Sequence, residues 1–357
     1  MMERQPLLEL LSLSIGCGIG FEPLDDSAWK DLFMQAREQA VLGITMQGLD
    51  ALPRTEGAPL KIYGSWALAS ETIEARSLDR QKLARSIYGL FSSAGLPCCV
   101  LKGPSVARFY PQPLRRQSGD IDIWVPAGRK KLLSFLRGRC KVGAVVYHHC
   151  KCDISGKPGE VEVHFTPSWM NSPRLNKRLQ RYFAKSAAAE TACPDPELGF
   201  CVTSPQFSFV FGIVHFWRHM LDEGIGLRHL ADLYYTVLSI PPQSYEEISG
   251  QLRDLGLYRL SCALAGALVL AFGLSASSLP VPPDTVQGTI LLQDMLLSGN
   301  FGRSDKALQA QTGSRCEAAL AKFRRSMRYM HFCPSDVLCA PLFKLWQFVW
   351  RAINHYL

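Results

Sequence analysis

The sequence lacks the features that mark a secreted or a disulfide-stabilised protein. Its 12 cysteines include no Cys-x-x-Cys pair, and no export signal places them in an oxidising compartment. The N-terminal segment has no net positive charge, and Glu9 interrupts its apolar run, so we expect no signal peptide. We therefore predict a cytoplasmic protein whose thiols are reduced and mostly buried.

A hydrophobic run long enough to cross a membrane is also missing. The most apolar window, around Leu260 to Leu274, contains Gly266 and Gly273 and is shorter than the ~20 residues that a membrane helix needs. We interpret this window as a buried helix and expect no membrane partner.

Charge of one sign is not concentrated anywhere in the chain. The sequence has 39 Lys and Arg against 31 Asp and Glu, a formal charge of +8 that is spread over its length. Basic helices are expected over 128–139, 176–185 and 322–328, but they lack the aromatic interleaving and the single stripe of a nucleic-acid binder. We interpret them as solvated faces, although the charge is compatible with phosphate-bearing partners.

The sequence has the composition of an ordinary globular protein, and its periodicity divides it into three regions. Of its 357 residues 47% are apolar and 20% are charged. This length allows two or three packing units. No internal repeat is evident in the sequence.

Helical periodicity predominates over 1–95, where Asp25 or Asp26 can cap a helix and further helices are expected over 61–69 and 72–92. It also predominates over 171–357, where Ser204 followed by Pro205 marks a helix start. Residues 96–170 alternate between short strands and helices, with one β-rich segment over 141–155 and a turn at 156–159. We predict an α+β fold in which a mixed β-sheet core with helices is flanked by N-terminal and C-terminal helical regions.

An apolar stripe follows one face of the last predicted helix, over residues 340–357. Leu342, Trp346, Val349 and Ile353 recur at helical spacing. We expect this stripe to belong to the core and prefer that interpretation to a partner-binding surface.

The most informative stretch is Asp120-Ile-Asp122, inside a strand predicted over 119–125. Residues i and i+2 of a strand share one face, so the two carboxylates would stand side by side and repel each other unless a cation lies between them. Ile121 and Ile123 would face the core. Taken alone, the triplet could equally be a surface Asp-x-Asp.

A second acidic strand is predicted over 160–165. Its alternation places Glu160, Glu162 and His164 on one face. If this strand pairs beside the first, one of the glutamates becomes a third carboxylate, and three such groups can hold two Mg²⁺ ions against a nucleoside triphosphate. We expect His164 to orient the Glu162 carboxylate as a metal-supporting neighbour, in preference to acting as a general base.

A phosphate-binding turn is predicted just upstream, at Lys102-Gly-Pro-Ser105. Gly103 allows the backbone to approach a phosphate closely, the following helix offers free N–H groups, and Lys102 or Ser105 can contact phosphate oxygens. Arg116 precedes the acidic triplet and can offer a forked cation to the triphosphate.

Two further pairs share a helix face because their members are four residues apart. Arg228 could reach the nucleotide while Asp232 orients it, or the two could form an intrahelical ion pair. His215 and His219 have neither the Glu of a His-Glu-x-x-His motif nor an evident third ligand, so we expect histidines of the core or cleft and no zinc site.

The sequence resembles uncharacterised bacterial nucleotidyltransferases of the polymerase-β-like superfamily. Their core carries a glycine-containing turn, Asp-x-Asp, and a third acid on a later strand. The matching stretches cover most of the chain: 101–103, 110–113, 116–123, 161–165, 224–232, 333–338 and 341–342. The resemblance implies that Glu162 is the third acid and Glu160 the weaker candidate.

These patterns together predict a Mg²⁺-dependent enzyme that transfers a nucleoside monophosphate from a nucleoside triphosphate such as ATP to an acceptor hydroxyl and releases pyrophosphate. Asp120, Asp122 and Glu162 would hold two Mg²⁺ ions, or Mn²⁺ in their place, while Lys102, Gly103, Ser105 and Arg116 would hold the triphosphate. The acceptor could be a small molecule, a protein or an RNA. The competing hypothesis is a nucleotide-binding or interaction module that keeps the fold without turnover.

Overall fold

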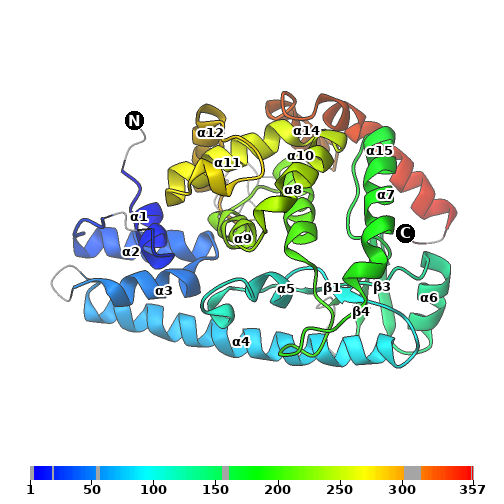
Figure 1. Cartoon of the computed structure of the whole chain (residues 1–357), viewed down its shortest axis with the longest axis horizontal. Helices are drawn as coiled ribbons and strands as arrows, with labels where there is room; N and C mark the ends of the chain where they lie inside the picture. The colour runs from blue at the N-terminus through cyan, green and yellow to red at the C-terminus, as the bar shows by residue number, and fades with distance from the viewer. Residues whose placement is uncertain are drawn as a thin grey trace.

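A mixed sheet with helices before and after it in the chain makes up the protein (Figure 1). This computed structural model describes residues 4–17, 20–53, 57–154, 161–300, 315–354 and 356, with only the backbone described over 315–321. The predicted Gly156–Gly159 turn and Glu160 lie outside these residues. The described part of the chain confirms the predicted α+β class.

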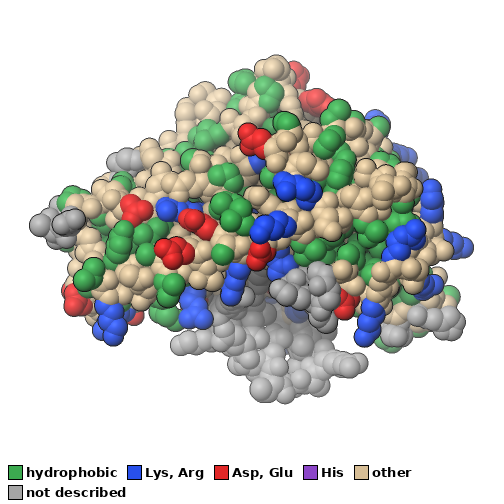
Figure 2. Space-filling model, turned by 90° about the horizontal axis from the view of Figure 1, so that it is seen from below, with side chains coloured by type: hydrophobic (Ala, Val, Ile, Leu, Met, Phe, Trp, Pro, Cys, Tyr) green, Lys and Arg blue, Asp and Glu red, His purple; other side chains and the backbone are tan. Residues whose placement is uncertain are grey.

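Four helices precede the sheet: α1 (Pro6–Ser14), α2 (Asp26–Glu38), α3 (Leu42–Ala51) and α4 (Leu60–Ser92). As predicted, an aspartate caps α2, because Asp25 accepts a hydrogen bond from the Ala28 N–H at 2.8 Å. The sequence indicated two helices over 61–92, but α4 is one helix, since neither Pro nor Gly separates the two halves. Charges of both signs are interspersed on the face that α4 lies along (Figure 2).

The sheet has five strands in the order β1-β2-β5-β4-β3. Only β2 and β5 pair in parallel, and the other neighbours are antiparallel. The single β-rich segment expected over 141–155 is in fact two strands. The strands are β1 (Cys99–Val100), β2 (Ile121–Trp124), β3 (Lys141–Val145), β4 (His149–Asp153) and β5 (Val161–His164).

One face of the sheet packs on α4 and on α6 (Arg129–Arg137). Ile121 and Ile123 are buried there with Ile87, as the strand alternation predicted. Each such side chain stabilises the fold by about 1.5–3 kcal/mol when fully buried. The opposite face meets α8, because Trp124 stacks on Phe207 with ring centroids 5.8 Å apart. Asp122 shares this second face with Trp124.

The remaining helices follow the sheet, apart from the short α5. Ser204 caps α8 by accepting from the Phe207 N–H at 3.3 Å, which confirms the predicted helix start. The apolar window becomes the buried helix α11, as expected, and among the described residues no helix has the length and apolarity of a membrane span. These helices are α5 (Pro104–Ala107), α7 (Pro173–Glu190), α8 (Pro205–Asp222), α9 (Leu227–Leu238), α10 (Tyr245–Asp254), α11 (Tyr258–Phe272), α12 (Thr285–Ser298), α14 (Arg315–Arg328) and α15 (Pro334–Ile353).

The apolar stripe of α15 is not core, so that prediction is wrong. Leu342 and Ile353 are 70% and 71% exposed, and Trp346 and Val349 are each 47% exposed. The helix buries only its first two turns, through Asp336, Val337 and Ala340. Periodicity identified the stripe correctly, but it carries no information on whether another element covers it.

Candidate active site

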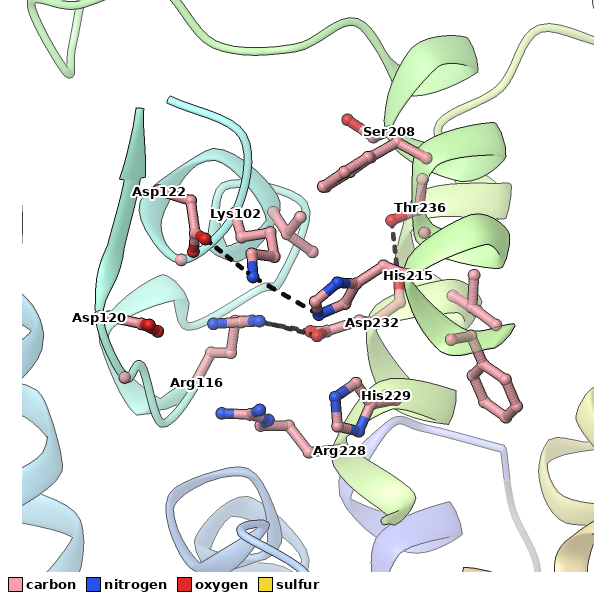
Figure 3. A pocket seen from close by; sticks show the side chains of 17 residues that line it. Lys102, Arg116, Asp120, Asp122, Ser208, His215, Arg228, His229, Asp232 and Thr236 are labelled. Carbon is pink, nitrogen blue, oxygen red and sulfur yellow. Dashed lines mark hydrogen bonds and ion pairs between the residues drawn. The ribbon is translucent and has the colours of Figure 1, made fainter. Parts of the chain in front are cut away.

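A cleft lies between the sheet and the helices α8 and α9, at the point where β2 and β5 meet. It consists of two adjoining pockets of about 100 and 360 Å³. Both are lined by Lys102, Asp120, Asp122, Phe211 and His215. Figure 3 shows the smaller pocket, with the strand and turn residues on one side and the α8 and α9 residues on the other.

Two carboxylates oppose each other on the floor of this cleft. The parallel register of β2 and β5 places Asp122 directly beside Glu162. One oxygen from each of them and one nitrogen of His164 all lie within 4.8 Å of one another. The Asp122 side chain is 1% exposed and that of Glu162 is 13% exposed, so both charges are held away from bulk water.

Asp122 is surrounded by cationic and donor groups. Lys102 Nζ lies 3.0 Å from its Oδ1, and His164 Nε2 donates to the same oxygen at 2.9 Å. Burial acts to raise the pKa of Asp122, but the charge of Lys102 and the His164 hydrogen bond outweigh it and lower that pKa. Asp122 is therefore ionised, and its negative charge in turn raises the pKa of Lys102 against the opposing effect of burial.

Glu162 has less compensation than Asp122. Burial and the charge of Asp122 raise its pKa to about 6. The charges of His164 and Lys102 oppose this shift without cancelling it, and Lys151 Nζ lies 3.8 Å away on a side chain that is 50% exposed. A buried carboxylate pair with one member poorly compensated fits a divalent cation, which supplies the missing positive charge and takes oxygen ligands.

We expected Asp120 to stand beside Asp122 on the strand, but it lies outside the strand. β2 begins at Ile121, and Asp120 lies in the bend before it, where it is exposed. It lines both pockets, but it does not join the cluster of Asp122, Glu162 and His164. The prediction was wrong because side chains at i and i+2 share a face only where both residues have strand geometry.

The turn at Lys102 and Gly103 opens directly into the cleft. Gly103 has φ 62° and ψ −115°, a backbone conformation that favours glycine. Ser105, in contrast, is fully buried and does not line either pocket. Its hydroxyl accepts from the Thr203 N–H at 3.1 Å and contacts Thr203 Oγ1 at 3.1 Å. The Ser105 hydroxyl therefore ties α5 to the segment before α8 and does not face the cleft.

Arg116 is already paired within the protein. Its Nε and Nη2 donate to the two oxygens of Asp232, each at 2.7 Å, and Tyr110 adds a hydrogen bond at 2.7 Å. The pair is buried, and Asp232 raises the pKa of Arg116 against the opposing effect of burial. The short contacts of Asp232, on α9, are therefore with Arg116 and Tyr110, which come from the segment before β2.

Arg228 lies beside this pair and lines the same pocket. Its Nη1 donates to the backbone carbonyl of Gln117 at 3.0 Å. Burial and the neighbouring charge of Arg116 lower the pKa of Arg228 to about 10, so it remains a cation at neutral pH. Its guanidinium points in the direction of Asp120 (Figure 3).

Six of the eight histidines line the two pockets. His215 and His219 are cleft residues, as predicted, and His215 Nε2 lies 3.5 Å from Lys102 Nζ. Burial and the charge of Lys102 lower the pKa of His215 well below its ordinary value. His148 and His149 were not predicted as site residues, although the alternation of His149 and Lys151 with Cys150 and Cys152 is typical of a strand with one polar face.

The thiols agree with the expectation for cysteine. Eleven cysteines are described, all are free, and six of them are buried. Burial raises the pKa of Cys98 to about 12, so that this thiol is neutral and inert.

Comparison with protein families gives a match over most of the chain. Residues 25–272 match a family model described as "Uncharacterised nucleotidyltransferase". This range includes α2, the whole sheet, the cleft and most of the helices that close it. A search of curated proteins found no match.

Proposed function

Because the chain belongs to the family of uncharacterised nucleotidyltransferases, we propose that its cleft binds a nucleoside triphosphate with Mg²⁺ and transfers the nucleoside monophosphate to an acceptor hydroxyl. Membership makes the protein a nucleotidyltransferase; the metal, the triphosphate and the acceptor are the parts that we propose. The observation that carries the proposal is the register of Asp122 and Glu162 on adjacent parallel strands.

Asp122 and Glu162 would hold the ion, with Asp120 joining from the bend before β2. The carboxylate oxygens suit Mg²⁺ or Mn²⁺. When bound, such an ion supplies positive charge to the phosphates and lowers the pKa of the acceptor hydroxyl. His164 would fix the orientation of Asp122 through the 2.9 Å hydrogen bond. We assign it this role at Asp122, whose oxygen is nearer than the Glu162 oxygen at 3.8 Å.

The triphosphate would lie in the pocket that contains Gly103. Lys102 and Arg228 are its two cations within reach, and the Gly103 backbone permits close approach. The Arg116 guanidinium is held by Asp232, so we give it the role of shaping the pocket. Ser105 takes no part, because its hydroxyl is engaged by Thr203.

The acceptor would enter through the larger pocket, beside Glu162. Its oxygen would form a bond to the α-phosphorus while the bond from that phosphorus to the pyrophosphate oxygen breaks. The acceptor proton would leave toward the Glu162 side of the cleft, and pyrophosphate would depart on the Gly103 side. The four groups Lys102, Gly103, Asp122 and Glu162 would hold the two reactants in line.

The test is transfer of label from α-labelled ATP, GTP, CTP and UTP to components of a cell lysate, with Mg²⁺ or Mn²⁺ present. The lysate is separated into small molecules, proteins and RNA, so the labelled fraction identifies the acceptor class. We expect Asp122→Asn to reduce the rate by at least about a hundredfold. Asp79→Asn is the matched control, since that side chain is 77% exposed and lies on α4.

Two results would contradict the proposal. One is label transfer by Asp122→Asn at the rate of the unmodified protein. The other is the absence of both nucleotide binding and label transfer with all four triphosphates in the presence of either metal.

A further inference from the structure

Three histidine side chains converge at one end of the larger pocket. One nitrogen from each of His148, His149 and His164 lies within 4.8 Å of a nitrogen of the other two. They come from the start of β4, the residue before it and the end of β5, and His149 pairs directly with His164 across these strands. This cluster shares only His164 with the carboxylate group described above.

Two of the ring nitrogens are buried with no hydrogen-bond partner among the described residues. These atoms are Nδ1 of His148 and Nδ1 of His164. A buried nitrogen without a partner destabilises the fold. A ligand that takes up a lone pair from such a nitrogen would remove this cost.

The groups around His148 and His164 have the arrangement of a metal ligand and its support. When the His164 ring is neutral, donation from Nε2 to Asp122 leaves Nδ1 with a lone pair for the ion. Metal-ligating histidines commonly donate their second nitrogen to a carboxylate in this way. The His148 ring packs against Trp169, with ring centroids 4.0 Å apart, and this contact fixes its orientation.

We propose that His148, His149 and His164 form a binding site for a first-row transition metal ion of the Zn²⁺ or Co²⁺ class. Imidazole nitrogens suit these ions, whereas Mg²⁺ takes oxygen ligands and would not compete for the three rings. The 2.7 Å contact between His148 Nε2 and His149 Nδ1 would break, because the ion takes one lone pair from each of the two rings. The site is separate from the Mg²⁺ that we propose at Asp122 and Glu162.

An ion at this site would influence the carboxylates without touching them. His164 connects it to Asp122 at 2.9 Å, and His149 connects it to Glu162, with Nε2 3.4 Å from Oε1. It would hold β4 and β5 in register and add positive charge behind both acids. Its binding does not depend on whether the cleft transfers nucleotides.

The experiment is a titration of the metal-free full chain with Co²⁺, followed by the visible absorption of the bound ion, with excess Mg²⁺ present throughout to fill oxygen sites. We expect one Co²⁺ per chain in the unmodified protein. His148→Phe keeps the ring that packs on Trp169, and His149→Gln replaces the second ligand, so each should weaken Co²⁺ binding at least tenfold while circular dichroism confirms folding. His331→Phe is the control, because His331 is exposed and lies outside the cleft.

Two outcomes would overturn this inference: equal Co²⁺ affinity in the two cluster variants and the control, or no Co²⁺ binding to the unmodified protein while Mg²⁺ is present. Asp120→Asn separates this inference from the proposed function. That change should abolish nucleotide transfer but leave Co²⁺ affinity unchanged, because Asp120 is not part of the histidine cluster.

Discussion

Asp122 and Glu162 are direct neighbours across the parallel strands β2 and β5, and both carboxylates are shielded from water. Their environments differ, because Lys102 and His164 compensate Asp122 while Glu162 has only weaker contacts. This asymmetry determines how each residue should respond to substitution, pH and metal.

Glu162→Gln should stabilise the metal-free protein at pH 7.5. The pKa of Glu162 is raised from 4.5 to about 6 in the fold, which corresponds to about 2 kcal/mol against the ionised form. An acid with a raised native pKa binds more protons when folded, so its unfavourable contribution is absent below pH 4.5, grows between pH 4.5 and 6, and is complete above pH 6. Urea unfolding of both proteins at pH 4 and pH 7.5 would measure this difference.

The gain in stability of Glu162→Gln should disappear at pH 4, where glutamic acid and glutamine are both neutral. At pH 7.5, saturating Mn²⁺ should make the variant less stable than the parent. A variant that is less stable than the parent at pH 7.5 without metal would show that Glu162 is compensated in some other way.

Asp232→Asn should destabilise the fold by about 3 kcal/mol, because it leaves the Arg116 guanidinium buried without its counter-charge. The side chains of Arg116 and Asp232 are 6% and 17% exposed. The control is Asp79→Asn, which removes an exposed pair with Lys82 and should change stability by less than about 0.5 kcal/mol. Equal free energies of unfolding for the two variants would contradict the structural role assigned to Arg116.

Lys102→Gln should increase the affinity for Mn²⁺ in the absence of nucleotide, by several-fold to about tenfold. The ammonium of Lys102 lies 3.0 Å from the same Asp122 oxygen that would bind the ion, so the two cations compete. The same change should weaken binding of the triphosphate. Calorimetry with Mn²⁺ alone and then with nucleotide separates the two effects.

Lys151→Gln is the matched control for that experiment. Lys151 is half exposed, and its Nζ lies 3.8 Å from Glu162, so solvent screens its charge and the Mn²⁺ affinity should change little. An unchanged or lower Mn²⁺ affinity in Lys102→Gln would argue against a metal at Asp122.

Two substitutions in α15 should differ strongly in their effect on stability. Leu342→Ala changes a side chain that is 70% exposed and should alter the free energy of unfolding by less than about 0.5 kcal/mol. Val337→Ala, in the buried first turn, should cost about 1–3 kcal/mol because it leaves a cavity. Thermal unfolding would compare them, and a large loss for Leu342→Ala would mean that the apolar face is covered in solution.

Much of the fold could be predicted from patterns of neighbouring residues. The cap at Asp25, the start of α8 at Ser204 and the inward side of β2 all follow from residues close together in the chain, where spacing determines geometry. Glu162 was placed beside Asp122 on the condition that the two strands pair, and the sheet order satisfies that condition.

Contacts between distant segments could not be predicted in the same way. The ion pair of Arg116 and Asp232 forms because α9 packs near the segment before β2. The residues around either partner do not predict this pairing. His148 and His149 were not predicted because two consecutive histidines do not indicate a site by themselves. They become part of a cluster only because the neighbour of β4 is β5, which carries His164. The exposed stripe of α15 shows the same limit, since amphipathicity does not identify the covering partner.

The placement of β5 between β2 and β4 has a kinetic consequence. β2 and β5 are far apart in the chain, so a native metal site at Asp122 and Glu162 exists only after β5 has paired with β2. An ion that binds only the paired strands stabilises the folded state relative to the unfolded chain. If this pairing forms after the folding transition state, the ion slows unfolding and leaves the rate of folding nearly unchanged.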